Sequence, residues 1–318
     1  MRSANAKMAT VGVVFRPKPP SLVIRGEKGR GSYGTVCHGK LEGKPVMIKR
    51  IHEILLTSSR SNQLRKFEQE CQILETLHHP NIVRSLGAFW DGATREPLLV
   101  MEPMRENLRE HLERRKQADA KLSVDDHLSI ALSIAEGLKF LHEQKQPIAH
   151  RDLNDKNILV GEDGSVKIGD FGQSTLLAGS TEYMGTMAPG AIVFMPPEAL
   201  MDEPHYNLKV DSFSMGVLML EVSTQMSPPA RMGNIGSSQE VERRSKDLAL
   251  LDSCHPLKPL IIWCLQNQYK LRPDVATIHS QLMTLVRACL HLCFVVCLAW
   301  PLGGVFRVCK QFIWINAQ

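Results

Sequence analysis

The chain has 318 residues, of which 43% are hydrophobic and 22% charged, and its formal net charge is +5. This length allows one large domain or two lobes with separate cores, and the ordinary composition excludes a chain that is disordered throughout. The mild positive charge is not gathered into a basic stripe interleaved with aromatic residues, so the sequence indicates no nucleic-acid partner.

The cysteines and the first residues bear on the compartment. The eight cysteines show none of the paired spacings typical of zinc sites or of a disulfide framework. The first twenty residues lack the continuous apolar core of a secretory signal. We therefore expect a cytoplasmic protein, in a reducing compartment that also holds ATP.

The pattern along the chain changes from β-like to helical. Residues 1–21 end in a run rich in proline and basic residues, which predicts an extended, flexible leader outside the folded domain. Short apolar runs between glycine turns then predict a small antiparallel sheet. Its strands are predicted at residues 22–24, 34–39, 45–51, 82–89 and 98–101.

Two helices are predicted from apolar residues at helical spacing. The first covers Leu64–Leu77, between the third and fourth strands, and the second covers Val124–Glu143. The sequence thus predicts an α+β architecture. A small β-rich lobe, 22–102, would join a larger and mainly helical lobe, 105–285.

A glycine-rich run, Gly29–Val36, lies between the first two predicted strands. Because glycine lacks a Cβ, such a backbone can fold closely over phosphate groups. The same glycine spacing marks Rossmann folds, but a Rossmann loop opens a helix, whereas residues 35–38 are typical of a strand. The run therefore favours a lid over nucleotide phosphates. Its candidate binding residues are Gly29, Gly31, Ser32, Gly34 and Val36.

Lys49 ends an apolar strand and lies fifteen residues after Gly34, which places a cation beside this lid. It is a candidate ligand for the α- and β-phosphates of a nucleotide, although a lysine taken alone is more often a solvated surface charge. The first helix should supply its partner carboxylate. Glu70 follows Phe67 by three residues and shares the face that turns towards the sheet, so it is a better partner than Glu68.

The most informative stretch is His150–Asn157, followed by Asp170-Phe171-Gly172. In order, it supplies a possible general base, Asp152, and two side chains that can bind a metal, Asn157 and Asp170. The tripeptides at the two ends each arise easily by chance. Both in this order, with an asparagine five residues after Asp152, seldom do, so the stretch indicates phosphoryl transfer.

Together these motifs resemble the eukaryotic protein kinase superfamily over residues 22–285. The pattern is most like the tyrosine-kinase-like group, whose members mainly phosphorylate serine and threonine. The resemblance implies a bilobal kinase fold, ATP and Mg²⁺ as cofactors, and a protein hydroxyl as the acceptor. It also implies that Asp152 orients the hydroxyl and accepts its proton, while Asn157 and Asp170 hold Mg²⁺ against the β- and γ-phosphates.

The same resemblance assigns roles to further residues around the nucleotide. Met101 would be the gatekeeper, Glu102 to Met104 the hinge whose backbone meets adenine, and Leu159 a further nucleotide-binding residue. Lys156 matches the place where some tyrosine kinases put an arginine.

The resemblance also covers the activation loop, expected from Asp170 to Glu198. Arg151 would receive a phosphate carried by one of the serine, threonine or tyrosine residues between 173 and 189. Arg272 is expected to pair with Glu198 at the end of the loop.

Several positions depart from the family pattern. Met47 stands where most kinases have an alanine above the adenine ring, and its longer side chain would crowd that pocket. Asn154 replaces a lysine that contacts the γ-phosphate, and Ala191 replaces a threonine that bonds the same lysine. Ser85 replaces a larger residue in the hydrophobic stack behind the first helix, which would loosen that helix.

These departures leave two questions open. The first is whether the chain is an active kinase or a pseudokinase, which would serve as an ATP-binding or scaffold module without phosphoryl transfer. The second is whether the acceptor is serine or threonine, as the general pattern favours, or tyrosine. Because the base, the metal ligands and the Lys49–Glu70 pair are intact, the sequence favours the active kinase.

Residues 286–318 form a hydrophobic tail beyond the resemblance. Within it, 288–306 holds no Asp, Glu, Lys or Arg and a single histidine, His291, which approaches the composition and length of a segment that spans a bilayer. Basic residues flank both ends and indicate no orientation. A membrane anchor, as in a tethered adaptor, a helix packed on the larger lobe and a poorly folded extension are the open interpretations. The sequence does not indicate the oligomeric state.

Overall fold

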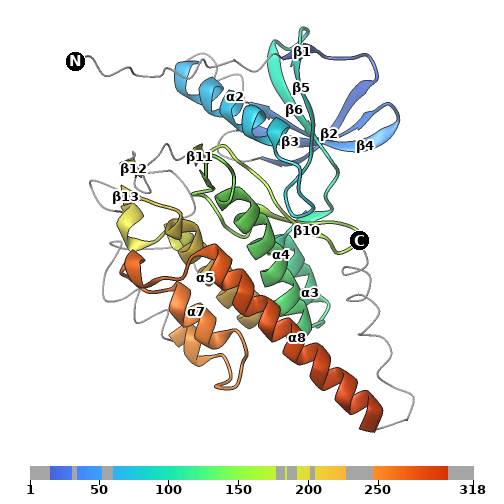
Figure 1. Cartoon of the computed structure of the whole chain (residues 1–318). Helices are drawn as coiled ribbons and strands as arrows, with labels where there is room; N and C mark the ends of the chain where they lie inside the picture. Colours follow the sequence, from blue (N-terminus) through green and yellow to red (C-terminus); the bar gives the residue numbers. More distant parts are fainter. Residues whose placement is uncertain are drawn as a thin grey trace, which may run out of the picture.

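The chain forms two lobes of different character, one built on a sheet and one mainly helical (Figure 1). The computed structural model describes residues 15–30, 34–51, 60–176, 183–184, 192–200, 205–226 and 246–299. The α+β bilobal fold expected from the sequence is confirmed.

A six-stranded sheet forms the smaller lobe, in the order β1-β5-β6-β4-β3-β2. The strands are β1 (Arg16–Pro17), β2 (Leu22–Arg30), β3 (Gly34–Leu41), β4 (Lys44–Ile51), β5 (Ser85–Asp91) and β6 (Glu96–Met101). All neighbours in this sheet pair antiparallel except β1 and β5, which are parallel. The five strands predicted from the sequence are therefore present, and β1 adds a sixth.

The alternation of side chains along β4 decides which residues face the site. Val46 and Ile48 point to one face, where they join a small core with β2, β3, β5 and β6. Met47 and Ile51 belong to the main core on the opposite face. Since successive side chains on a strand point to opposite faces, Lys49 shares the face of Met47.

The helix α2 (Arg60–Thr76) packs on this same side of the sheet, against β5 (Figure 1). Its apolar residues Phe67, Cys71 and Leu74 are buried at the spacing that predicted the helix. Glu70 lies among them and is only 2% exposed. The buried face of α2 therefore carries a carboxylate towards Lys49.

The last residues of the predicted leader belong to the folded lobe, which corrects the expectation for 1–21. Arg16–Pro17 pairs in parallel with Phe89–Trp90 of β5, and the amide of Lys18 donates to the carbonyl of Trp90. A strand of two residues is too short to show any alternation, so the sequence pattern gave no sign of it.

Five helices form most of the larger lobe in the described part of the chain. They are α3 (Leu108–Gln117), α4 (Val124–His142), α5 (Lys209–Thr224), α7 (Lys258–Cys264) and α8 (Val275–Ala299). Short elements connect them: β7 (Glu106–Asn107), β8 (Ile148–Ala149), β9 (Ile158–Val160), β10 (Val166–Ile168), β11 (Thr175–Leu176), β12 (Tyr183–Met184), β13 (His205–Tyr206) and the 3₁₀ turns η1 (Ile192–Phe194), η2 (Pro197–Leu200) and η3 (Tyr269–Leu271).

The helix α4 begins where its sequence specifies a cap. The hydroxyl of Ser123 accepts from the amide of Asp126, and the carboxylate of Asp126 accepts from the amide of Ser123, which is a reciprocal capping box. The helix then runs to His142, one residue short of the prediction.

The helix α5 is buried along its whole middle part, from Val210 to Val222, so it forms the centre of the larger lobe.

The helix α8 crosses the larger lobe, and its last turns extend beyond the neighbouring helices (Figure 1). Leu282 and Val286 are buried, and Cys289 packs against the same core. The tail segment 288–306 therefore begins as a continuation of a packed helix, and its residues from 300 onwards lie outside the described residues. In the part of the chain that the structure describes, no helix combines the length and apolarity needed to cross a membrane.

Candidate active site

Three ionisable side chains from different elements meet between the lobes. The ammonium of Lys49 on β4 donates to both carboxylate oxygens of Glu70 on α2, at 2.7 and 2.8 Å. It also donates to Oδ1 of Asp170, which follows β10, at 2.9 Å. The predicted pairing of Lys49 with Glu70 is therefore present, and the structure adds Asp170 as a second partner.

Burial and charge act in opposite directions on these groups. Burial favours neutral Lys49, but the charges of Asp170 and Glu70 outweigh it and raise the pKa of Lys49 above its usual value. Burial would likewise raise the pKa of Asp170, yet the neighbouring Lys49 holds that pKa below its usual range. For Glu70, burial raises the pKa to about 7, against the opposing charge of Lys49. Lys49 and Asp170 are therefore both charged at neutral pH.

The residues after Asp170 fix its carboxylate. The amide of Gly172 donates to Oδ1 of Asp170 at 3.2 Å. A Cβ on Gly172 would lie 3.2 Å from that oxygen and 3.6 Å from Glu70 Oε2, so a larger residue would be a tight fit against the carboxylate of Asp170. Phe171 is fully buried, and its ring meets the ring of His150 edge to face at 5.1 Å. The Asp-Phe-Gly run is thus fixed by the bond between Gly172 and Asp170 and by the contact of Phe171 with His150.

Asp211, a buried carboxylate on α5, anchors the loop that carries Asp152. Its oxygens accept from the amides of His150 and Arg151, both at 2.9 Å, and from the ring of His142 at 2.8 Å. Arg151 has a φ of +67°, a left-handed conformation that costs energy in any residue with a side chain. The two bonds to Asp211 offset that cost and so determine where Asp152 lies.

Two asparagine amides hold the carboxylate of Asp152. The amide of Asn157 donates to Asp152 Oδ2 at 3.0 Å and to its carbonyl at 2.7 Å. The amide of Asn154 donates to Asp152 Oδ1 at 3.0 Å and to the same carbonyl at 2.9 Å. In turn, Asn154 Oδ1 accepts from the amides of Lys156 and Asn157. The residue that replaces the expected lysine therefore orients Asp152.

A cavity of about 190 Å³ lies beside Lys49 and is lined by both lobes. It brings together most of the residues predicted to bind a nucleotide or metal: Gly29, Val36, Lys49, Glu70, Met101, Glu102, Met104, Lys156, Asn157, Leu159 and Asp170. Gly31 and Ser32 lie outside the described residues.

Three predicted residues lie apart from this cavity. Asp152 lines a smaller adjoining pocket together with Lys49, Glu70 and Asp170. Gly34 has a different role: a Cβ there would lie 2.0 Å from the carbonyl of Arg50, so its glycine permits the close pairing of β3 and β4. Arg151 lines neither pocket.

Met47 forms part of the cavity wall, as its position predicted. It is buried and lies opposite the gatekeeper candidate Met101 across β4 and β6. Because drug-sized ligands usually occupy pockets of about 300 Å³ or more, the volume of about 190 Å³ shows a narrow site.

Lys28 is a wall residue that the sequence analysis did not single out. It precedes Gly29 on β2, and its ammonium donates to the carbonyl of Met104 at 2.8 Å and to that of Arg105 at 2.6 Å. Met104 is the last residue of the expected hinge, and Arg105 follows it. They lie 76 and 77 residues after Lys28 in the chain. Lys28 therefore crosses the mouth of the cavity where a nucleobase would meet the hinge.

Replacing Lys28 with leucine is expected to tighten ATP binding about 3- to 10-fold, because a nucleobase would no longer displace two charged hydrogen bonds and would gain an apolar contact. Calorimetric titration measures this, with Lys40→Leu as the control, since Lys40 is exposed on β3 of the same lobe. Weaker binding by Lys28→Leu alone would show instead that the ammonium contacts the nucleotide.

A buried ion pair secures the last segment of the expected activation loop. Both terminal nitrogens of Arg272 donate to the carboxylate of Glu198, at 2.5 and 2.8 Å. The guanidinium also lies 4.8 Å from the centre of the Phe213 ring on α5. The predicted pairing of Arg272 with Glu198 is therefore present, and it attaches this segment to the central helix. Ala191 lies outside the described residues.

The residues at the cavity fit the cofactors that the sequence predicts. Mg²⁺ prefers oxygen ligands, usually one or two carboxylates together with phosphate oxygens. Asp170 offers a carboxylate, and Asn157, whose amide nitrogen bonds Asp152, offers its carbonyl oxygen. Among the described residues, no three His, Cys, Asp or Glu side chains form a cluster that could hold a metal alone. These ligands therefore suit a cation that binds together with a nucleotide.

Comparison with known proteins agrees with the geometry. The sequence profile of the protein tyrosine and serine/threonine kinase family matches residues 22–282. The chain is 35% identical over 273 residues to serine/threonine-protein kinase CTR1 of Arabidopsis thaliana, an alignment covering 84% of this chain and 32% of that protein. It is 34% identical over 204 residues to serine/threonine-protein kinase TNNI3K of Mus musculus, which covers 64% and 24%.

A third relative is named for a broader specificity. The chain is 30% identical over 262 residues to serine/threonine/tyrosine-protein kinase HT1 of Arabidopsis thaliana, covering 81% of this chain and 64% of that protein. The chain thus spans less than two thirds of the length of each of these three relatives.

Proposed function

The chain belongs to the protein tyrosine and serine/threonine kinase family, and we propose that it transfers the γ-phosphate of ATP to a hydroxyl group of a protein, with serine or threonine as the favoured acceptor. The observation that carries the proposal is the joint placement of Lys49, Glu70 and Asp170 beside Asp152. Ionisable groups with shifted pKa values that gather at a cavity are typical of functional sites.

Each residue has a distinct task in this proposal. Lys49, fixed by Glu70, binds the α- and β-phosphates and keeps the nucleotide in register. Asp152 accepts the proton of the substrate hydroxyl at its carboxylate, which Asn154 and Asn157 hold in one orientation. Val36 and Leu159, from the two lobes, provide apolar surfaces for the nucleobase.

Asn157 and Asp170 would hold Mg²⁺. When bound, the cation neutralises charge that develops on the β- and γ-phosphate oxygens. The contribution of the chain is to keep both ligands in place before the nucleotide arrives. Lys49 and Gly172 do so for Asp170.

The choice of acceptor rests on the specificities for which the relatives are named. All three relatives are named as serine/threonine kinases, and one also as a tyrosine kinase. Lys156 is exposed and lines the cavity, at the position where the resemblance places an arginine in some tyrosine kinases, so it supports the tyrosine alternative. We therefore favour serine and threonine, and keep tyrosine or dual specificity as the alternative.

Arg151 is the proposed receptor for a phosphate on the activation loop. Lys66 on α2 donates to the side chain of Gln173 in that loop at 3.2 Å, and burial together with the charge of Arg151 lowers the pKa of Lys66. Two cations that repel one another favour an anion between them. Phosphorylation of the loop would therefore link α2 to the loop that carries Asp152.

A pseudokinase is the second candidate, favoured by the narrow cavity. Met47 and Lys28 both line the cavity, and Lys28 bonds the carbonyl of Met104 in the expected hinge. If they exclude the nucleotide, the chain would act through its surface as a scaffold module.

The test is incubation of the purified chain with Mg²⁺, a generic protein substrate and ATP labelled at the γ-phosphate, followed by acid hydrolysis to identify the labelled residues. Label on serine or threonine is the expected result, and label on tyrosine would change only the acceptor. Absence of label would contradict the proposal. Nucleotide titration of the same sample would then distinguish a scaffold that binds ATP from one that does not.

A further inference from the structure

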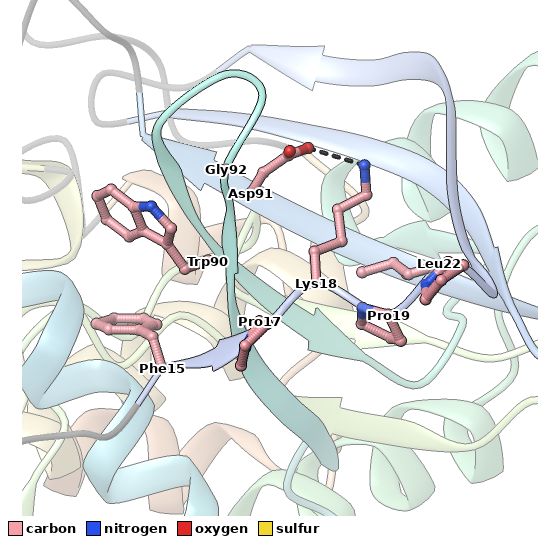
Figure 2. Close-up of a pocket in the computed structure, with 9 residues that line it drawn as sticks. Phe15, Pro17, Lys18, Pro19, Leu22, Trp90, Asp91 and Gly92 are labelled. Carbon is pink, nitrogen blue, oxygen red and sulfur yellow. Dashed lines mark hydrogen bonds and ion pairs between the residues drawn. The ribbon is translucent and has the colours of Figure 1, made fainter.

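An N-terminal strap, defined here as residues 15–20, runs along the outer edge of the sheet in the smaller lobe. Its backbone pairs with Phe89–Trp90 of β5, and the guanidinium of Arg16 lies 4.9 Å from the centre of the Phe89 ring. The ammonium of Lys18 forms an ion pair with Asp91 at 2.9 Å (Figure 2). The strap is therefore attached to β5 at several points.

Phe15, the first residue of the strap, contacts the helix α2. Its ring stacks on the ring of Phe67, with centroids 6.3 Å apart and an angle of 11° between the planes. It also meets Trp90 of β5 at 6.4 Å in an edge arrangement, and the two rings lie side by side in Figure 2. Phe15 thus contacts both α2 and the sheet strand to which the strap is fixed.

The contact lies one turn of helix from the charge pair of the site. Phe67 and Glu70 are three residues apart, so they share one face of α2. The distances of 2.7 and 2.8 Å between Lys49 and Glu70 hold only while α2 lies close to the sheet. A contact that fixes Phe67 therefore also fixes the position of Glu70.

We propose that the strap is a positioning element for the reaction: Phe15 stacks on Phe67 and thereby holds α2 where Glu70 pairs with Lys49. The effect on rate rests on the proposed kinase function, whereas the effect on α2 does not. An aromatic pair changes an equilibrium constant by roughly 2- to 12-fold, so loss of the Phe15 ring should shift the position of α2 by a comparable factor.

Kinetics of three variants test the effect on the reaction. Phe15→Ala removes the ring, Phe15→Tyr keeps it, and Lys18→Ala removes a part-exposed ion pair at the other end of the strap. We expect kcat to fall about 3- to 10-fold for Phe15→Ala, with KM for the protein substrate unchanged. The other two variants should stay within about twofold of wild type, because Phe15→Tyr keeps the ring and the ion pair of Lys18 joins the strap to β5 rather than to α2.

A double-variant comparison separates positioning from general destabilisation. If Phe15 acts through Glu70, then Phe15→Ala should change the rate by less than about twofold when Glu70→Gln is already present. A loss of the same factor in both backgrounds would overturn the proposal, since independent effects multiply.

Amide hydrogen exchange provides a readout that needs no activity. In Phe15→Ala, exchange should quicken in α2 and stay unchanged in α4, which the strap does not contact. Unchanged exchange in α2 would overturn the proposal even if the wild-type chain transfers phosphate. If the wild-type chain transfers none, the proposed function fails, and the exchange result alone decides the role of the strap.

Discussion

Replacing Asp170 with asparagine is expected to lower the rate of phosphoryl transfer roughly 10²- to 10³-fold, because a metal ligand in such a site contributes several kcal/mol to the transition state. The substitution keeps the size of the side chain. It removes the negative charge that Mg²⁺ would meet and that Lys49 contacts at 2.9 Å. Single-turnover transfer at saturating Mg²⁺ and ATP measures the loss.

The matched control for this prediction is Asp163→Asn. Asp163 is an exposed aspartate in the turn between β9 and β10, where it accepts from the amide of Ser165. We expect its variant to transfer phosphate within about twofold of wild type. A rate for Asp170→Asn within about threefold of wild type would show that this carboxylate is not a metal ligand in the reaction.

Replacing Arg272 with alanine is expected to lower the free energy of unfolding by about 3–5 kcal/mol, the usual result of leaving one buried charge without its partner. Arg272 is 2% exposed and Glu198 is 7% exposed. The variant also loses the bonds from the guanidinium to the carbonyls of Gln266 and Asn267. Urea unfolding followed by circular dichroism measures the change.

Two further variants show whether burial causes this effect. Lys139→Ala removes an exposed pair with Glu143 on α4, and we expect a loss of about 0.5 kcal/mol or less. Arg272→Lys keeps the charge but not the two parallel hydrogen bonds. Its loss of unfolding free energy should therefore lie between the losses for Arg272→Ala and Lys139→Ala. Equal losses for Arg272→Ala and Lys139→Ala would contradict the account of the buried pair.

The sequence predicts those parts of the site that follow from local spacing. The pairing of Lys49 with Glu70 follows from a strand that ends in a lysine and from helical spacing that buries Glu70 with Phe67. The pairing of Arg272 with Glu198 is what the resemblance to protein kinases implies, and the structure contains it. For Lys49 and Glu70, the local pattern and the tertiary contact specify the same arrangement.

Other features depend on register and backbone geometry that no local pattern shows. Lys28 reaches the carbonyl of Met104 because β2 and the hinge lie side by side, although 76 residues separate them. The strap at 15–20 pairs through a strand of two residues, which is too short to show alternation. Such contacts become visible only in three dimensions.

Asn154 departs from the family motif but has a structural role of its own. The resemblance predicts only the loss of a positive charge near the γ-phosphate. In the structure, the amide of Asn154 bonds the carboxylate and carbonyl of Asp152 and so supports the base directly. In place of the γ-phosphate contact that the resemblance implies for a lysine, Asn154 therefore provides a contact that orients Asp152.

The measurement that tests the central claim most directly is transfer of labelled γ-phosphate by the wild-type chain and by Asp152→Ala, purified in parallel and assayed with Mg²⁺ and one generic protein substrate. Our account predicts clear labelling by the wild type and a rate at least about 10²-fold lower for the variant, because general base catalysis contributes about 10²- to 10⁴-fold. ATP binding should be the same for both. Equal labelling by the two proteins, or none by either, would contradict the account.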